Sequence, residues 1–166
     1  MDEAAFAFDA DFRARAPTLD CRPERTDDRA FVAELFVRCS PLTGSLPDTM
    51  VLQQAQIQFG AFAAAYPHAM RRIATRAGEP IGRLIIDWND THSHMVDVAV
   101  LPEHQKSGTG TALLQAWLAV SDGLGKPARL NVRFDNPAVR LYMRLGFVAA
   151  ESDGVFITML RPAGLP

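Results

Sequence analysis

The spacing of hydrophobic residues changes along the chain and predicts which segments are helices and which are strands. From Asp27 to Cys39, apolar residues recur every three or four positions, which is typical of a helix with one buried face. The same spacing predicts helices at Asp48–Tyr66 and Thr109–Val120. A fourth helix is expected between Asn136-Pro137 and Gly146, because asparagine caps helices, proline suits their first position and glycine ends them.

Shorter apolar runs between these segments predict strands. Two runs flank the turn signal Gly78-Glu79-Pro80 and two flank Asp153-Gly154, so each set predicts a hairpin. Further strands are expected at Thr18–Pro23, Met95–Leu101 and Arg129–Phe134. The strand–helix–strand unit around the third helix implies one parallel pair in an otherwise antiparallel sheet. We therefore predict an α/β fold, a three-layer α-β-α sandwich with a mixed central sheet.

The length of 166 residues suits one domain, which we place at residues 18–162. Residues 1–17 are interpreted as an N-terminal extension before that domain. Phe6, Phe8 and Phe12 give this extension apolar surface to bury against the domain or a partner chain. We interpret it as a partly ordered terminus.

Composition and charge exclude several classes of protein. The net charge of −2 provides no basic field for a nucleic-acid backbone. Two cysteines, Cys21 and Cys39, are too few for a disulfide framework and lack the spacing of a metal site, so no metal is expected. The acidic start and the glutamines within the uncharged stretch 49–70 argue against an export signal and a membrane span. We expect a soluble cytoplasmic protein with no membrane or nucleic-acid partner.

The segment from Val98 to Leu114 combines a buried strand, a glycine-containing turn and the first turn of an amphipathic helix. Helix starts present unpaired N–H groups and the positive end of the helix dipole, and they bind phosphate. Gly108 and Gly110 keep side chains out of the approach, and Lys106 adds a positive charge. An ordinary strand-to-helix loop would have the same glycines, and the segment fits neither a Walker A loop nor the dinucleotide fingerprint.

Two motifs in this order resemble the GNAT superfamily of acyl-CoA-dependent N-acyltransferases. The run Gln105-Lys106-Ser107-Gly108-Thr109-Gly110 is similar to the family's Gln/Arg-x-x-Gly-x-Gly/Ala signature. The run from Asn136 to Phe147 is similar to its Asn-x-x-Ala-x-x-Leu-Tyr-x-x-x-Gly-Phe segment. The resemblance covers roughly Leu19 to Pro162 and agrees with the predicted order of elements.

The resemblance implies a binding site for acetyl-CoA as cosubstrate. The cofactor arm would lie where the parallel strand pair splays, along the strand that ends in the glycine turn. Lys106 stands where many members have glycine, which backbone binding tolerates if φ stays negative there. The implied cofactor-binding residues are Val98, Ala99, Val100, Gln105, Lys106, Ser107, Gly108, Thr109, Gly110, Thr111 and Asn136.

Three residues are candidates for catalysis. Tyr142 would lie beside the sulfur and protonate the leaving thiolate, although core packing is the alternative for this side chain. Strand N–H groups near residues 98–100 would stabilise the oxyanion. Asp97 and His94 are candidate bases, Asp97 because burial raises a carboxyl pKa and His94 because histidine titrates near neutrality. Asp97 could equally anchor a loop, and His94 could be solvated.

The sequence therefore predicts an N-acetyltransferase that moves an acetyl group directly to a primary amine of a small molecule or peptide. The alternatives are a non-catalytic acyl-CoA-binding or sensing module and transfer of a longer acyl group. We expect the acceptor to be walled by residues 40–47, the helix from Asp48 and the turn at 152–154, with Gln53 and Gln54 as polar contacts. The extension and the last hairpin are candidate surfaces for a homodimer.

Overall fold

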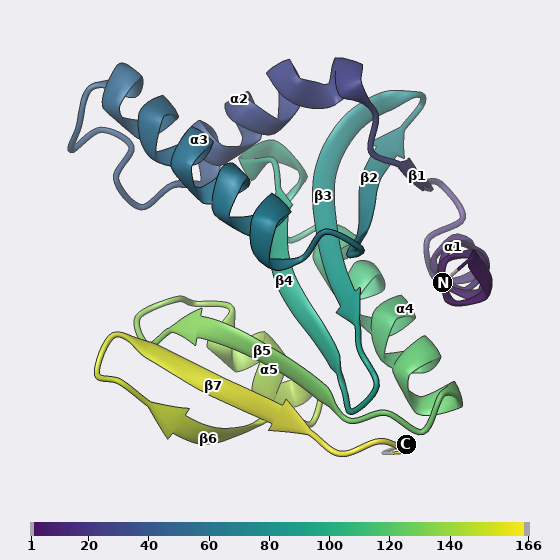
Figure 1. Cartoon of the computed structure of the whole chain (residues 1–166). Coiled ribbons are helices and arrows are strands. Elements are labelled where there is room, and N and C mark those ends of the chain that lie inside the picture. Colours follow the sequence, from purple (N-terminus) through teal and green to yellow (C-terminus); the bar gives the residue numbers. More distant parts are fainter. Residues whose placement is uncertain (1, 165–166) are drawn as a thin grey trace.

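A computed structural model describes residues 2–164. A seven-stranded sheet in the order β1-β2-β3-β4-β5-β7-β6 forms its middle layer (Figure 1). The strands are β1 (Asp20–Pro23), β2 (Met70–Arg76), β3 (Glu79–Trp88), β4 (Ser93–Val100), β5 (Ala128–Arg133), β6 (Val148–Ser152) and β7 (Phe156–Arg161). The helices are α1 (Asp2–Arg15), α2 (Arg29–Cys39), α3 (Asp48–Ala65), α4 (Thr109–Gly123) and α5 (Val139–Arg144), with 3₁₀ turns η1 (Thr26–Asp28) and η2 (Pro102–His104).

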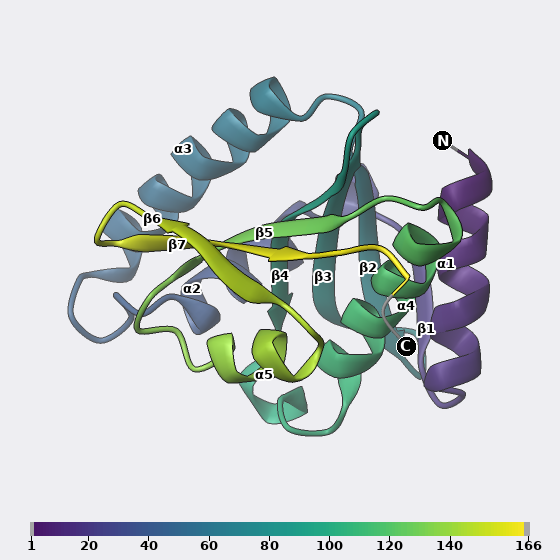
Figure 2. The same cartoon turned by 90° about the horizontal axis from the view of Figure 1, so that it is seen from below.

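Helices cover both faces of this sheet. The pair α2 and α3 lies on one face, whereas α1, α4 and α5 lie on the other (Figure 2). The core between α4 and the sheet contains Trp117, whose indole stacks against Phe147 with ring centroids 5.7 Å apart. Every other strand pair is antiparallel, and β4 and β5 are parallel. The predicted sandwich with a mixed sheet is confirmed.

The N-terminal segment differs from its prediction. Residues 2–15 form α1, which packs along α4. Phe8 and Phe12 are completely buried, with stacked rings 6.3 Å apart, while Phe6 is 77% exposed. Asp9 also accepts two hydrogen bonds from Arg72 of β2, at 2.7 and 3.1 Å. The interpretation as a partly ordered terminus is therefore wrong, because two phenylalanines one helical turn apart complete the core. The domain boundary after residue 17 stays a prediction.

The parallel strands β4 and β5 separate soon after they meet. They pair only at residues 93–95 with 128–130 and then diverge (Figure 1). On its other edge β4 continues to pair with β3, but Met95 and Asp97 face the consecutive residues Ile86 and Ile85, so Val96 is an extra residue. Such a bulge bends a strand and redirects its side chains. The bulge thus lies where the parallel pairing stops, and residues 96–100 keep an edge without a neighbouring strand on the β5 side.

Candidate functional site

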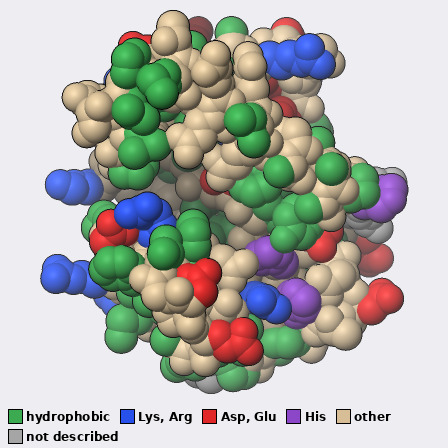
Figure 3. Space-filling view, turned by 60° about the vertical axis from the view of Figure 1, so that its left-hand side comes forward, with side chains coloured by type: hydrophobic (Ala, Val, Ile, Leu, Met, Phe, Trp, Pro, Cys, Tyr) green, Lys and Arg blue, Asp and Glu red, His purple; other side chains and the backbone are tan. Residues whose placement is uncertain are grey.

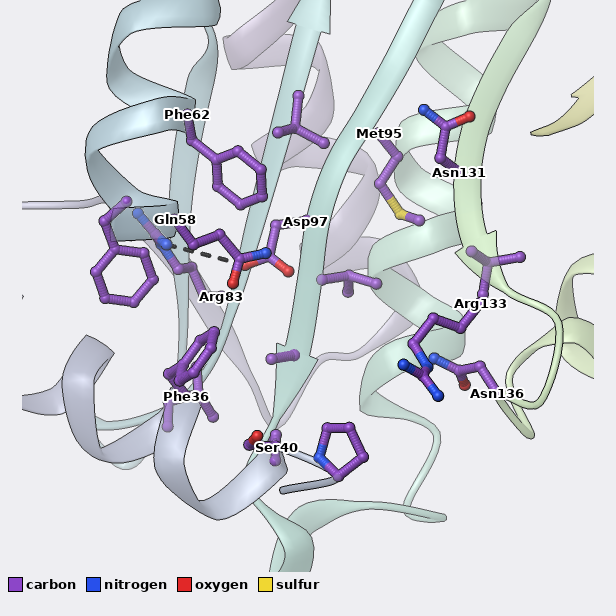
Figure 4. A pocket seen from close by; sticks show the side chains of 18 of the residues that line it. Phe36, Ser40, Gln58, Phe62, Arg83, Met95, Asp97, Asn131, Arg133 and Asn136 are labelled. Carbon is purple, nitrogen blue, oxygen red and sulfur yellow. Dashed lines mark ion pairs between the residues drawn. The ribbon is translucent and has the colours of Figure 1, made fainter. Parts of the chain in front are cut away.

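A cavity of about 580 Å³ opens where β4 and β5 diverge. One wall comes from α2 and α3, and the other from β5, α5 and the start of β7. In close view, Asp97 points from β4 toward Arg83, Gln58 and Phe62, whereas Asn131 and Asn136 lie across the strand (Figure 4). Six of the predicted catalytic and cofactor-binding residues line the cavity, namely His94, Asp97, Val98, Ala99, Asn136 and Tyr142.

Asp97 is the end of a chain of charged side chains that begins outside the cavity. Its Oδ2 lies 3.8 Å from Nη1 of Arg83. Arg83 in turn donates to Glu24 from Nε at 2.7 Å and from Nη2 at 3.0 Å, and its guanidinium lies 5.2 Å from the ring centre of Phe59. The Arg83 side chain is only 7% exposed, and its Nη1 has no hydrogen-bond partner among the described residues. The three charges sum to −1, with the unneutralised carboxylate facing the cavity.

The environment of Asp97 raises its pKa to about 6. Burial is the largest cause, since it disfavours the charged form, and the negative charge of Glu24 acts in the same direction. The positive charge of Arg83 and a hydrogen bond from the Val98 N–H oppose it. Asp97 therefore changes its protonation state close to neutral pH, which an exposed aspartate does not do.

Arg83 and Glu24 are expected to shift the pKa of Asp97 in opposite directions. Arg83→Gln removes the favourable positive charge and should raise this pKa, whereas Glu24→Gln removes a negative charge and should lower it. Carbon-13 NMR titration of the Asp97 carboxyl measures both shifts. Asp9→Asn breaks a comparably buried ion pair with Arg72 and should leave the Asp97 titration unchanged. Shifts of the same sign in both variants would contradict the described geometry.

Tyr142 and His94 line the same cavity but differ in their protonation. Tyr142 is 4% exposed, and burial together with the charge of Asp97 raises its pKa to about 12, so its phenol is protonated at neutral pH. The His94 ring meets Tyr66 edge-on at 5.4 Å, and burial lowers the pKa of His94 to about 4, helped by the charge of Arg129. His94 is thus neutral at pH 7, and the expectation that it could be solvated is wrong because it is buried.

The turn between β4 and α4 presents a row of backbone N–H groups. Among the described residues, the N–H groups of positions 106–111 have no protein acceptor. The side chain of Gln105 holds the turn to the strand end by donating to the Val100 carbonyl at 2.9 Å, and the Ser107 hydroxyl donates to the His104 carbonyl at 2.6 Å. Lone N–H groups at the start of a 15-residue helix form a site for an anion.

The backbone of this turn corrects one expectation. Lys106 has a φ of +57°, so the condition of a negative φ at this lysine, which stands where many family members have glycine, is not met. Gly108 has a φ of +89°, in the region that favours glycine. A Cβ at Gly108 would meet nothing within 4 Å, and one at Gly110 would meet only Val100 Cγ2 at 4.0 Å. Internal packing therefore does not require glycine at position 110, and the space beside the N–H groups is open.

Sequence reasoning missed Arg83 and Glu24, which lie 59 positions apart and meet only in the fold. Arg83 does carry a signal, because it is a charge inside the apolar run from Ile81 to Ile86. The predicted acceptor walls are present in part, since Ser40, Leu42 and Gln54 line the cavity but Gln53 does not. Ser152 and Asp153 instead line an adjoining hollow of about 540 Å³, which shares Asn131 and Phe156 with the cavity.

Two further kinds of site are absent from residues 2–164. No three His, Cys, Asp or Glu side chains are grouped so that they could hold a metal ion. No described helix has the length and apolar character needed to cross a membrane.

Comparison with known proteins agrees with this geometry. Residues 68–149 match the family model described as acetyltransferase (GNAT) domain. The PaiA N-acetyltransferase of Thermoplasma acidophilum, solved in complex with coenzyme A, superposes with a TM-score of 0.72 at 15% identity, over 87% of this chain and 98% of that one. The ribosomal-protein-S18-alanine N-acetyltransferase of Escherichia coli gives 0.66 at 21% identity, over 89% and 96%. Residues 68–149 therefore match a GNAT acetyltransferase domain, and the chain shares the fold of these two N-acetyltransferases.

Curated relatives match over shorter stretches. An N-alpha-acetyltransferase of Sulfurisphaera tokodaii is 33% identical over 90 residues, which is 45% of this chain and 54% of that protein. A mycothiol acetyltransferase of Streptomyces coelicolor is 40% identical over 93 residues, which is 52% of this chain and 29% of that protein. The chain thus matches about half of one relative and less than a third of the other.

Proposed function

We propose that this protein transfers an acetyl group from acetyl-CoA to a primary amine. The observation that carries the proposal is that β4 lines a cavity where it diverges from β5 and then leads into the turn whose unpaired N–H groups begin α4. In an acyl-CoA the pantetheine arm joins a diphosphate to a thioester, and the N–H turn suits the diphosphate while the cavity suits the thioester. The PaiA neighbour is an N-acetyltransferase solved in complex with coenzyme A, which supports the same cosubstrate here.

In this proposal the chain holds the cosubstrate mainly through its backbone. The N–H groups of residues 106–111, with the Lys106 side chain, bind the diphosphate. The open β4 edge at residues 98–100 pairs with the amide groups of the pantetheine arm, and Asn136 contacts the arm from the opposite side. No metal takes part, because backbone donors and the helix dipole supply the stabilisation of the phosphates.

The transfer would proceed in one displacement. Asp97 removes a proton from the acceptor ammonium, and the neutral nitrogen attacks the thioester carbonyl. The C–N bond forms, N–H groups of the β4 edge stabilise the oxyanion, and the C–S bond then breaks. Tyr142 gives its proton to the thiolate and regains one from the newly bonded nitrogen. Asp97 is a better base than His94 because its pKa of about 6 lies nearer neutrality than the value of about 4 for His94.

Assembly and location remain predictions. Phe6 on α1 and Val148 on β6 are exposed apolar residues, at 77% and 61%, on the two surfaces expected for a homodimer. The strand β6 is also an edge of the sheet, where another chain can pair. The proposed location is the cytoplasm, because the two free cysteines, Cys21 and Cys39, suit a reducing compartment.

Gly110→Asp is expected to weaken coenzyme A binding at least about tenfold, as measured by calorimetry. The added carboxylate lies in the first turn of α4, where it repels a diphosphate but favours the helix dipole, so the thermal midpoint should not fall. Gly110→Ala is the matched control, because its methyl group fits at 4.0 Å from Val100 and adds no charge. If coenzyme A binds the aspartate variant as tightly as the wild type, the diphosphate does not bind at this turn.

Release of free thiol from acetyl-CoA in the presence of a panel of primary amines tests the proposed function. We expect release that depends on both acetyl-CoA and an amine. Binding of acetyl-CoA without acetylation of any amine would favour the non-catalytic binding module instead. Stronger binding and faster turnover of a longer acyl-CoA would favour transfer of a longer chain.

A further inference from the structure

A row of aromatic side chains lines the α2 and α3 side of the cavity. Phe59, Phe62 and Tyr66 recur along one face of α3 and its last turn, and Phe36 joins them from α2. All four are partly exposed and line the cavity. Phe36 and Phe59 meet edge-to-face at 5.7 Å, and Tyr66 meets His94 at 5.4 Å. These contacts orient the rings of Phe36, Phe59 and Tyr66, and Phe62 lies between the last two along the helix. We refer to these four residues as the aromatic row.

The aromatic row stands beside the reacting carboxylate. Figure 4 shows Phe36 and Phe62 on the same side of β4 as Asp97, while Arg133 and Asn136 lie on the other side. The proposed cosubstrate arm occupies the side of Arg133 and Asn136, which leaves the aromatic side for the acceptor. The space-filling view shows hydrophobic side chains on both sides of the hollow between the helices and the C-terminal strands (Figure 3).

The charges around the cavity restrict the acceptor further. Asp97 is the one acidic residue among the described residues that line it. Both lining arginines are paired with carboxylates, Arg83 with Glu24 and Arg133 with Asp135, the latter at 2.8 and 3.0 Å. A second ammonium would therefore find no second carboxylate. An acceptor carboxylate next to the amine would face the net charge of −1 on the Glu24–Arg83–Asp97 chain.

We propose that the acceptor is a small primary monoamine with an aromatic body and no carboxylate beside the amine. This inference rests on the proposed function. The amine binds at Asp97, and the ring packs against Phe36 and Phe62 of the aromatic row. An aromatic ring gains from both burial and edge-to-face contact in such a site. Polar groups on this wall that could receive a peptide backbone are few, namely Ser40, Gln54 and Gln58.

A panel of five acceptors tests the inference, with thiol release from acetyl-CoA as the readout. The panel contains 2-phenylethylamine, butylamine, 1,4-diaminobutane, phenylalanine and a peptide that begins with phenylalanine. We expect kcat/KM for 2-phenylethylamine to exceed that of each other compound at least about tenfold. Preference for the diamine, the amino acid or the peptide would overturn the inference while the acetyltransferase proposal stands.

Phe62→Ala separates recognition by the aromatic row from general damage. It should raise KM for 2-phenylethylamine at least about tenfold and change that for butylamine much less, with acetyl-CoA binding intact. Phe62→Tyr should restore most of the loss. Ile57→Ala on the same helix is the control, because Ile57 is 74% exposed and does not line the cavity. Equal losses for both amines would assign Phe62 a structural role and overturn its part in recognition.

Direct binding keeps the inference testable even without turnover. Calorimetry with 2-phenylethylamine and the coenzyme A-bound protein should show binding that Phe62→Ala weakens. If no amine is acetylated but this binding is present, the proposed function fails and the site still recognises aromatic amines. If amines are acetylated and 2-phenylethylamine does not bind, the acceptor class is wrong.

Discussion

Asp97→Asn is expected to lower kcat/KM for amine acetylation about 10³-fold at neutral pH. The amide has nearly the shape of the carboxylate but cannot take a proton from the attacking nitrogen. In the wild-type protein, activity should rise as the pH increases through about 6, because Asp97 must be ionised to act as the base. Steady-state rates over a pH range measure both effects, and the variant should lack this acid limb.

Acetyl-CoA binding and a control variant show whether the loss of activity in Asp97→Asn comes from the missing base. The dissociation constant of acetyl-CoA should be unchanged in Asp97→Asn, since the carboxyl lies on the acceptor side of β4. The control is Asp87→Asn, because Asp87 lies on β3 and does not line the cavity. Near wild-type activity in Asp97→Asn would exclude Asp97 as the base.

The raised pKa of Asp97 also has a stability signature. A carboxyl whose pKa is higher in the folded state than its ordinary 3.8 binds an extra proton when folded, so its contribution to stability is lost as the pH rises from about 4 to about 6. His94, whose pKa is lowered, contributes with the opposite sign over a similar range. Asp97→Asn should therefore leave a free energy of unfolding that increases more steeply with pH than in the wild type. The free energy of unfolding, measured with denaturant for both proteins from about pH 4 to about pH 7, checks this expectation. This pH range covers the two shifted pKa values.

Tyr142→Phe is expected to lower kcat about 10²-fold, because the departing thiolate loses its proton donor. The pKa of about 12 keeps the phenol protonated at the working pH, so the donor form is present throughout. None of the described residues hydrogen-bonds the Tyr142 hydroxyl, and the ring contact with Phe147 at 6.1 Å is retained by phenylalanine. Single-turnover measurement of thiol release determines the chemical step directly.

The two roles considered for Tyr142 give different results in this variant. A chemical role predicts slower turnover with acetyl-CoA binding and the thermal midpoint unchanged. A packing role predicts that phenylalanine, which keeps the ring, changes neither turnover, acetyl-CoA binding nor the thermal midpoint. Wild-type turnover in Tyr142→Phe would therefore leave core packing as the function of this side chain.

The elements of the fold could be predicted because each depends on neighbours in sequence. The helix at 109–123 follows from its apolar spacing, and the turn before it follows from Gly108 and Gly110. Its use as an anion site needs only the geometry of a helix start, which is the same in every fold. The helix α1 was not predicted, because its burial depends on α4, which lies about a hundred positions further on.

The sequence by itself determined the order of helices and strands after α1, the class of fold and the glycine turn that begins α4. Periodicity, turn chemistry and helix ends are local, and so they can be read along the chain. Only the tertiary structure decided that Arg83 lies between Glu24 and Asp97, that burial brings the pKa of Asp97 near neutrality, and that four aromatic residues line the same cavity as this carboxylate. Charge coupling and burial depend on which distant residues become neighbours and on how much water they exclude, and both are properties of the folded chain.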